Sequence, residues 1–300
     1  MNRAKEAKID EYYTLLPDIE EELRHYIQFF KNKNIYCCCD HPKQSNFYKY
    51  FCDNFEELGI KKVVATCTNT EKVALYSECV SKDIINSSVL KGDGDIFSDE
   101  CKPFFNEADI VVTNPPFSKT RNLIIDLYRN KKDFILVANR NIVITKLIFP
   151  LFINKDLKIG FGFKNNTASF LIPSQLIGKY SKDVTRKKEN EVRFRNITWL
   201  TSLDINVPVK HIVLKNNYSQ NKYPKYDQFD AINVDRISDI PIDYFGTMGV
   251  PITILDRFDF EQFELLGLDR YMQGNVSGKR FTINGVEKYA RVMVRYIKKE

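Results

Sequence analysis

The sequence predicts an α/β protein with a mainly parallel sheet and helices on both faces, followed by a C-terminal α+β region. Between residues 17 and 163, helical apolar spacing alternates with short apolar runs, which is typical of strand–helix–strand units. Polar turns follow several of these runs. After Pro173 the alternation gives way to basic and tyrosine-rich stretches. We therefore expect a boundary within residues 205–230 and divide the chain into residues 1–215 and 216–300.

The first predicted helix runs from Pro17 to Phe30. Proline fits the first helical position, and Asp18 suits the positive end of the helix dipole. Apolar residues follow on one face: Ile19, Leu23, Tyr26, Ile27 and Phe30. The apolar run from Ile35 to Cys39 then predicts a buried strand that ends at Asp40.

A second helix should begin after Ser45, a residue that suits the N-cap, and end at Gly59. Its apolar residues are Phe47, Tyr50, Phe51, Phe55 and Leu58. The segment from Lys61 to Cys67 predicts the second strand.

Three further strands should complete the predicted parallel order. A weak third strand passes through Ser88–Leu90 to the turn at Gly92–Asp95, and a fourth covers Asp109–Thr113. A helix with Leu123, Ile124, Leu127 and Tyr128 leads to the fifth, Phe134–Ala138. We expect two later strands in the same sheet and two antiparallel strands near the C-terminus. These are Ile159–Phe163, Ala168–Ile172, Val250–Leu255 and Tyr289–Ile297.

Bulk composition indicates an ordinary globular protein, with 43% hydrophobic and 28% charged residues among 300. No apolar run reaches the roughly 18 residues of a membrane helix. The first residues, Met1 to Glu6, lack the apolar core of a signal peptide, so we expect a cytoplasmic location. Cys37, Cys38 and Cys39 are consecutive and alternate between strand faces, which argues against a shared metal. We interpret the seven cysteines as small buried residues and expect no metal site.

Positive charge is concentrated in the second half of the chain. Residues 171–300 contain 21 Lys and Arg against 16 Asp and Glu, a net +5. The first 170 residues contain 24 and 23, a net +1. The difference favours a polyanion-facing surface in the second half.

Three polar segments should meet at the carboxyl edge of the predicted sheet, where open α/β sheets bind ligands. They are Asp40–Pro42, Gly92–Asp95 and Asn114–Phe117. In the last segment, two prolines fix the backbone and remove two donors, so the Asn114 side chain and the Pro115 carbonyl can accept hydrogen bonds from an amine. Phe117 offers a flat face for a base. The alternative is a rigid turn that Asn114 caps, but the strand before it and the acidic turn upstream favour an amine site.

This constellation resembles the amino-group methyltransferases that use S-adenosylmethionine, whose catalytic motif is Asp, Asn or Ser, two prolines, and Tyr or Phe. Over roughly residues 10–297, the chain resembles the EcoRI-type adenine-specific DNA methyltransferases, with similar segments in the same order. These are Asp10–Thr14, Tyr36–Pro42, Ser45–Phe47, Gly92–Asp95, Val192–Trp199, Tyr223–Asp227 and Met248–Thr253.

The resemblance implies a cofactor site. Tyr13 and Thr14 would hold the methionine end of the cofactor. Asp40, Pro42 and Ser45 stand in the place of the glycine-rich cofactor loop, although no Gly-x-Gly follows. Asp95, with Ile96 behind it, would bind the adenine amine of the cofactor; the alternative is Asp93. The ribose partner stays unassigned, since residues 66–69 lack the usual acidic residue.

The resemblance also changes how the basic and aromatic residues are interpreted. Without it, the basic cluster is an ordinary solvated surface; with it, phosphate contact is the better interpretation. The cluster comprises Arg186, Lys187, Lys188, Arg193 and Arg195. Trp199 either belongs to the core or lines the target-base pocket next to DNA. Phe161 and Phe163 are expected in the core.

The implied enzyme is a site-specific DNA methyltransferase with a seven-stranded-type sheet. It would transfer a methyl group directly from S-adenosyl-L-methionine to the amine of a flipped adenine in double-stranded DNA. Residues 1–215 would form the methyltransferase core and residues 216–300 the target-recognition region. We expect a monomer, with a restriction endonuclease of the same specificity as its candidate partner. The alternatives are methylation of RNA or a protein glutamine, and a non-catalytic DNA-binding protein with a degenerate cofactor site.

Overall fold

A computed structural model describes residues 12–67, 74–163, 167–172, 185–188, 190–209, 211–273, 275 and 278–297. At residues 185–188 and at Arg257 it describes the backbone alone. The chain divides into two compact units, Met1–Ile205 and Asn206–Glu300. This division lies at the start of the interval predicted for the boundary. Each unit is described by itself below.

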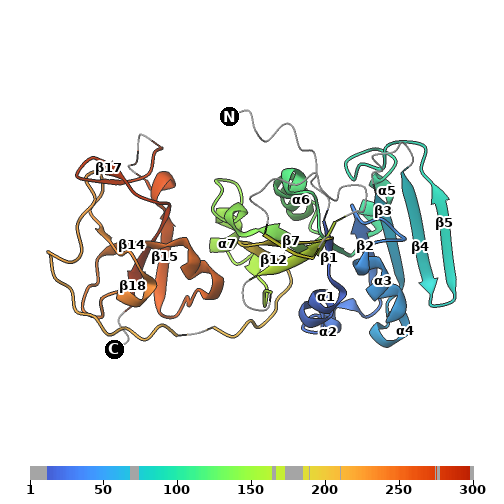
Figure 1. Cartoon of the computed structure of the whole chain (residues 1–300), viewed down its shortest axis with the longest axis horizontal. Coiled ribbons are helices and arrows are strands. Elements are labelled where there is room, and N and C mark those ends of the chain that lie inside the picture. The colour runs from blue at the N-terminus through green and yellow to red at the C-terminus, as the bar shows by residue number, and fades with distance from the viewer. Residues whose placement is uncertain are drawn as a thin grey trace. The chain divides into compact units, whose positions relative to one another are not determined.

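The first unit is organised around an eight-stranded mixed sheet with the order β5-β4-β3-β2-β6-β7-β12-β8 (Figure 1). Its strands are β2 (Asn34–Cys38), β3 (Lys62–Cys67), β4 (Leu75–Ser81), β5 (Ile84–Val89), β6 (Ile110–Thr113), β7 (Asp133–Asn139), β8 (Lys158–Ile159) and β12 (Ile197–Thr201). The four central strands β3, β2, β6 and β7 are parallel, whereas the strands on either side are added antiparallel. The sheet is therefore mixed, not mainly parallel.

Burial explains why the central strands were predictable. Strands β2, β6 and β7 are buried along almost their whole length, which suits continuous apolar runs of β-branched and small residues. Six of the seven cysteines are likewise buried, and Cys39 is half-buried; all seven are free. The interpretation of the cysteines as small buried residues is thus confirmed for six of them.

Helices cover both faces of this sheet, as predicted (Figure 1). On one face lie α1 (Leu16–Leu23), α2 (Ile27–Phe30), α3 (Asn46–Asp53) and α4 (Phe55–Leu58). On the other lie α5 (Lys102–Glu107), α6 (Phe117–Arg129) and α7 (Phe149–Ile153). Ser45 caps α3 by accepting from the Phe47 amide, and Gly59 ends α4 with a left-handed φ of 61°. The helix predicted from Pro17 to Phe30 is two shorter helices.

Three strand predictions in the first unit need correction. The strand predicted at Ile159–Phe163 is reduced to β8, which covers only Lys158–Ile159. The segment around Ser88 is not a third parallel strand: β5 is the antiparallel edge of a hairpin with β4 and is exposed throughout. The segment at Ala168–Leu171 (β9) belongs to a second sheet, with the order β1-β9-β11-β10. The other strands of this sheet are β1 (Tyr13–Thr14), β10 (Thr185–Lys188) and β11 (Glu191–Phe194). Side chains with apolar periodicity specify a strand, but they do not specify which sheet it joins.

The second unit contains a four-stranded sheet in the order β13-β14-β18-β15 and a β16–β17 hairpin. The strands are β13 (Ile232–Asn233), β14 (Thr247–Pro251), β15 (Phe263–Leu268), β16 (Thr282–Ile283), β17 (Val286–Glu287) and β18 (Arg291–Tyr296). The strand predicted at Tyr289–Ile297 is confirmed by β18, which pairs antiparallel with β14. The strand predicted at Val250–Leu255 is wrong beyond Pro251, because β14 ends there and the following residues form a 3-10 helix. The described part of this unit has 3-10 helices η4 (Ile237–Asp239), η5 (Ile252–Arg257) and η6 (Asp269–Tyr271), but no α-helix. The α+β prediction for this region is therefore not confirmed.

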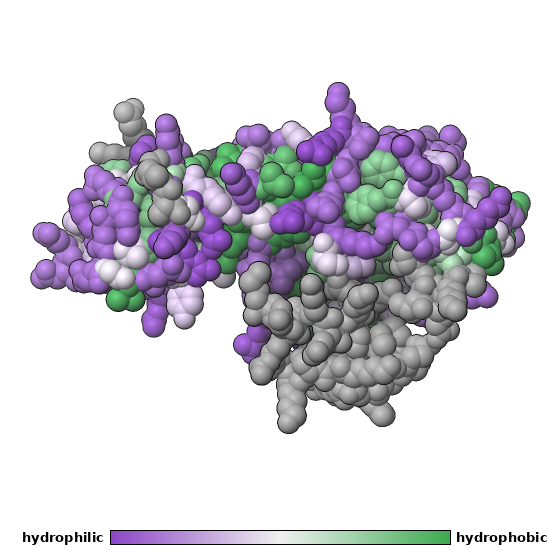
Figure 2. Space-filling model, turned by 90° about the horizontal axis from the view of Figure 1, so that it is seen from above, coloured by the Kyte–Doolittle hydropathy of each residue, from purple (hydrophilic) through white to green (hydrophobic). Residues whose placement is uncertain are grey.

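The surface seen in Figure 2 is mostly hydrophilic, with apolar patches in the first unit. Phe97 and Leu147 are among the exposed apolar side chains of this unit. Within the described residues, no helix has the length and apolar character needed to cross a bilayer.

Candidate active site

The candidate site lies where the order of the strands in the sheet reverses. From β2 the chain proceeds to β3 on one side, and it later returns to β6 on the other side. The carboxyl ends of β2 and β6 are therefore neighbours at a topological switch point, the usual ligand site of open α/β sheets. The Thr113 hydroxyl donates to the Cys38 carbonyl and ties the two strand ends together. Asp40 follows β2 here, and Asn114 follows β6.

The Asn114 side chain has a defined orientation. Its Nδ2 donates to the main-chain oxygen of Tyr12 at 2.7 Å. A carbonyl oxygen can only accept, so the amide nitrogen must face Tyr12 and the amide oxygen must face the other way. Asn114 thus presents Oδ1 as an acceptor beside the switch point.

The two prolines supply a second acceptor. Pro116 is the N-cap of α6, and its carbonyl accepts from the Lys119 and Thr120 amides at 2.9 and 3.1 Å. The Pro115 carbonyl receives no hydrogen bond from the part of the chain that the structure describes. Among the described residues, the Pro115 carbonyl thus has no donor and Asn114 Oδ1 faces away from Tyr12. Their use as acceptors for an amine stays a prediction.

Aromatic side chains surround the next residue, Phe117. The Tyr12 ring is stacked on it with centroids 6.0 Å apart, and Phe194 meets it edge-on at 6.3 Å. Phe170 lies behind, 6.0 Å from Tyr12 and 5.8 Å from Phe194. Tyr12, Phe117 and Phe194 are only partly buried, so they offer aromatic surface next to the two acceptors.

Two buried polar atoms near the end of β2 have no partner among the described residues. Asp40 is 4% exposed; its Oδ1 accepts from the Ser45 hydroxyl at 2.7 Å, but its Oδ2 has no donor. Burial raises the pKa of Asp40 to about 7, and the nearby hydroxyl groups of Thr113 and Ser45 offset this only in part. The Thr14 hydroxyl is also buried without a partner, while the Thr14 carbonyl accepts from Asn46. Buried orphan groups of this kind are expected where a polar ligand supplies the missing bonds.

The acidic turn has a compact internal structure. Gly94 has φ of 70°, and a Cβ there would lie 2.5 Å from the Cys67 carbonyl, so the position requires glycine. Asp93 is exposed and accepts from the Asp95 amide at 3.0 Å, whereas Asp95 is half-buried and accepts from the Phe97 amide at 2.9 Å. Ile96 is buried behind the turn. These positions favour Asp95 over Asp93 as the ligand-facing carboxylate.

Lys119, in the first turn of α6, forms an ion pair with Asp95. Burial alone would raise the pKa of Asp95, but the hydrogen bond from Lys119, the Phe97 amide and the charge of Lys119 lower it below its ordinary value. Asp95 is therefore a permanent anion at neutral pH. Sequence reasoning missed Lys119, although a cation in the first helical turn opposes the helix dipole and so signals a local acidic partner.

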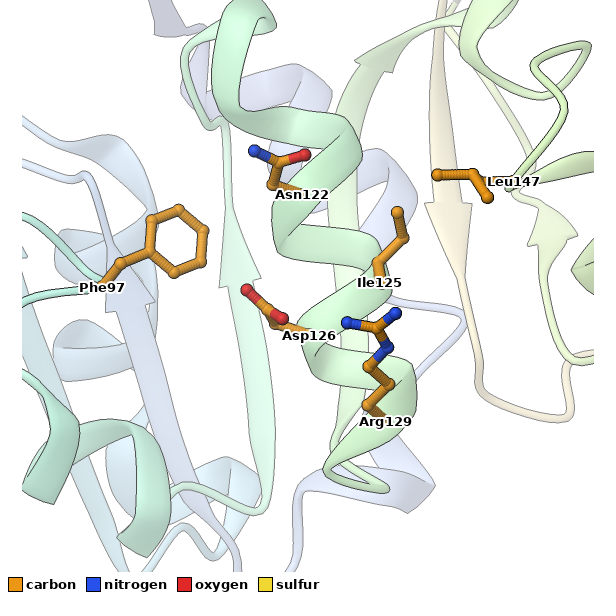
Figure 3. Close-up of a pocket in the computed structure, with 6 residues that line it drawn as sticks. All are labelled: Phe97, Asn122, Ile125, Asp126, Arg129 and Leu147. Carbon is orange, nitrogen blue, oxygen red and sulfur yellow. The ribbon is translucent and has the colours of Figure 1, made fainter.

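A cavity of about 380 Å³ lies on the outer side of α6, away from the face that packs on the sheet. Figure 3 shows the Phe97 ring pointing toward the helix side that carries Asn122 and Asp126, with Leu147 facing Ile125 from the other direction. The acidic turn thus approaches α6 through both Asp95 and Phe97.

The predicted DNA-contacting residues have different fates. Arg193 and Arg195 are exposed, and the described residues contribute no ion-pair partner to either. Phe194, between them, packs against the rings of Tyr12, Phe117 and Phe170, because neighbouring residues on a strand point to opposite faces. Arg186, Lys187 and Lys188 lie in β10, where only the backbone is described.

The burial of Trp199 does not support the prediction that its ring contacts DNA or a target base. It is fully buried in β12, stacked on Phe163 at 5.4 Å and edge-on to Phe47 at 5.8 Å. Trp199 is a core residue, and Phe163 is buried beside it as expected. Phe161 is instead partly exposed and stacks on His25 at 3.6 Å.

The remaining predicted cofactor residues are brought near the same edge. Tyr13 pairs with Leu171 in the second sheet, next to Thr14, and Pro42 lies in the partly exposed turn between Asp40 and Ser45. Segments Asp10–Glu11 and Thr68–Asn69 fall outside the described residues. Tyr12 and Phe194 belong to segments that carried the family resemblance, but their positions beside Phe117 depend on the second sheet, which the sequence did not predict.

Comparisons with known proteins give matches over nearly the whole chain. The family model described as adenine-specific methyltransferase EcoRI matches residues 1–88 and 76–297. The chain is 37% identical to the type II methyltransferase M.EcoRI of Escherichia coli, over 98% of this chain and 95% of that protein. It is 35% identical to the type II methyltransferase M.MgeORF184P of Mycoplasma genitalium, over 98% of both chains. Identity to M.MpnI of Mycoplasma pneumoniae is 34%, over 98% and 97%. No solved structure gives a significant match.

Proposed function

We propose, from the premise that this chain belongs to the EcoRI family of adenine-specific methyltransferases, that it methylates the exocyclic amine of an adenine rotated out of duplex DNA. Family membership makes the chain an adenine-specific DNA methyltransferase. The methyl donor, the extruded base and the residue roles are our proposal. As in a restriction–modification system, a companion endonuclease would cut the same sites, and the methyltransferase would act as a monomer.

The orientation of the Asn114 amide carries this proposal. An adenine amine has two N–H donors, and two acceptors at the switch point, Asn114 Oδ1 and the Pro115 carbonyl, match them. Accepting both hydrogen bonds would direct the nitrogen lone pair toward an electrophile and stabilise the positive charge that develops on nitrogen. Tyr12, Phe117 and Phe194 would hold the base by its faces and edge.

The chain's residues fit S-adenosylmethionine as the methyl donor. When bound, it supplies a sulfonium methyl group, which passes to nitrogen as the carbon–sulfur bond breaks and the amine loses a proton. Asp40 and Thr14 each have a buried oxygen without a partner, suited to polar groups of this cofactor. Asp95 is an anion that can accept from an adenine amine, with Ile96 beside it. Tyr13, Pro42, Ser45 and Asp93 complete the proposed cofactor surface.

DNA would be held at the same edge of the first unit. The exposed Arg193 and Arg195 flank Phe194, so phosphate contacts there would place the duplex beside the base-binding aromatics. We extend this role to Arg186, Lys187 and Lys188 on the neighbouring strand, and we assign sequence recognition mainly to the second unit.

Methyl transfer from labelled S-adenosylmethionine tests the proposal directly. Duplex DNA, RNA and protein are offered separately to wild type and Asn114→Ala, and methylated bases are mapped in DNA from cells that express each form. The expected result is N6-methyladenine within one sequence in wild-type DNA. Asn114→Ala should lose transfer by orders of magnitude and still bind the cofactor. Labelling of RNA or protein in preference to DNA would refute the substrate assignment.

A further inference from the structure

Lys119 connects two parts of the site that are distant in sequence. It lies two residues after Phe117, and its amide donates to the Pro116 carbonyl, so it is fixed to the start of α6. Its Nζ pairs with Asp95 Oδ2. The turn that contains Asp95 lies against the end of β3, whereas α6 follows β6 on the opposite side of β2. Lys119 is therefore next to Asn114–Phe117 in the sequence and in contact with the turn Gly92–Asp95 in the structure.

The pair completes a set of contacts that fix the Asp95 carboxylate. Oδ1 accepts from the Phe97 amide at 2.9 Å, and the Asp95 amide donates to Asp93 at 3.0 Å. Lys119 holds the remaining oxygen. Without Lys119, the carboxylate would be anchored through one oxygen only and could rotate about its terminal bond.

The position of Lys119 in the first turn of α6 is unfavourable for a cation unless an anion pairs with it. A cation in the first turn of a helix faces the exposed amide groups and positive dipole end, an unfavourable arrangement. Asp95 compensates for it, and the pKa of Lys119 accordingly lies above its ordinary value, since the pairing with Asp95 outweighs burial.

Resting on the proposed function, we propose that Lys119 is a positioning residue for the cofactor: it holds Asp95 in the orientation that accepts the adenine amine of S-adenosylmethionine. The carboxylate, fixed at both oxygens, is an acceptor at a defined place. The role of Lys119 lies in cofactor affinity, not in methyl transfer itself, because no described contact joins its ammonium to Asn114.

Binding of S-adenosylhomocysteine to the full chain, measured by calorimetry without DNA, tests this role. Lys119→Met should raise the dissociation constant about tenfold, because a mispositioned Asp95 weakens its charge-assisted hydrogen bond with the adenine amine of the ligand. Lys119→Arg keeps the charge and should stay within about threefold. Arg121→Met is the matched control, since Arg121 is exposed on the same helix and should bind like wild type. With saturating S-adenosylmethionine, methyl transfer by Lys119→Met should fall less than about threefold, because the effect is on affinity.

A double-mutant cycle separates positioning from general damage to the fold. If Lys119 acts through Asp95, Lys119→Met should weaken binding no further in an Asp95→Asn background. Full additivity of the two effects, or wild-type affinity in Lys119→Met, would overturn the assignment of Lys119 alone. Failure of the wild-type chain to bind S-adenosylhomocysteine would instead overturn the proposed cofactor and this role with it.

Discussion

Exchanging Asn114 for aspartate tests how the Tyr12 carbonyl orients the active-site amide. The family motif admits Asp at this position, but here the side-chain atom 2.7 Å from the Tyr12 oxygen must be a donor. An ionised carboxylate in place of the amide would put two acceptors in contact, so the side chain must turn away and leave the Tyr12 carbonyl unpaired. An unpaired group of this kind costs about 1–3 kcal/mol.

That energy sets the expected reduction in activity. If it appears in the transition state, methyl transfer falls about 5- to 200-fold, since each 1.36 kcal/mol is a factor of ten. The protonated carboxyl, in contrast, can donate to Tyr12 and accept the substrate amine, as asparagine does. The ratio of variant to wild-type rate should therefore rise as the pH is lowered toward the pKa of the new carboxyl, by no more than the same factor of about 5 to 200 in total.

Single-turnover methylation with prebound duplex and saturating S-adenosylmethionine, from pH 8 to pH 5.5, measures this ratio. Asn114→Ala is the control, because it cannot regain a donor and its ratio to wild type should not change with pH. An Asn114→Asp rate at or above wild type at pH 8 would refute the role of Tyr12. A ratio that is independent of pH would refute the donor requirement.

Three further outcomes follow from the site and its supporting turns. Because burial raises the pKa of Asp40 from 3.8 to about 7, the folded chain holds an extra proton between these values and should lose stability as the pH rises through them. Asp40→Asn should gain on wild type by up to about 4 kcal/mol between pH 4 and 8 in urea unfolding, and parallel profiles would contradict this. Gly94→Ala should lower the free energy of unfolding by clearly more than the roughly 1–2 kcal/mol of left-handed strain, because its Cβ would meet the Cys67 carbonyl. Gly278→Ala has a similar φ and open space around it, so the strain should be its only cost. Equal shifts in melting temperature would show that the backbone around Gly94 relaxes to admit the Cβ. Arg193→Gln and Arg195→Gln should each reduce the slope of the logarithm of the DNA-binding constant against the logarithm of the salt concentration. The expected reduction is about 1 for every phosphate that the arginine neutralises, and an unchanged slope would exclude phosphate contact.

Local sequence signals predicted the elements that build the central part of the first unit. The apolar runs of β2, β3, β6 and β7, the cap at Ser45 and the stop at Gly59 depend on neighbouring residues, so a pattern of spacing can identify them. The positions of Asp40–Pro42 and Asn114–Phe117 followed because parallel strands bring their carboxyl ends to one edge. Gly92–Asp95 instead follows the antiparallel strand β5 and reaches this edge through Gly94, which lies against the Cys67 carbonyl at the end of β3. The Asn114 and Pro115 acceptors were predictable for the same reason.

The remaining features depend on contacts between distant segments. The sequence around Ala168 predicts a strand, yet this strand pairs with β1, more than 150 residues earlier, and with β11, at least 20 residues later. That pairing places Tyr12 and Phe194 beside Phe117. Trp199 was open to two interpretations because an aromatic on a buried strand and one in a base pocket have the same local sequence. Only the rings of Phe163 and Phe47 decide between them.

The family segments of the second unit serve to hold its fold together. Gly249 must be glycine because a Cβ would collide with the ring and hydroxyl of Tyr226, and this hydroxyl donates to Asn233 at 2.8 Å. The Asp227 carboxylate accepts from the Thr282 hydroxyl and from the amides of Asn284 and Gly285, and so fixes the β16–β17 turn.

Side chains committed to such internal bonds are poorly placed to read bases, because base readout needs free donors and acceptors at the surface. Resemblance in these segments therefore concerns the architecture of the second unit and not the sequence preference that we propose for it. The residues that select the methylated sequence should be sought among exposed polar and aromatic side chains. Tyr271 and Tyr289, both exposed on this unit, are the first to replace in a screen for altered site preference.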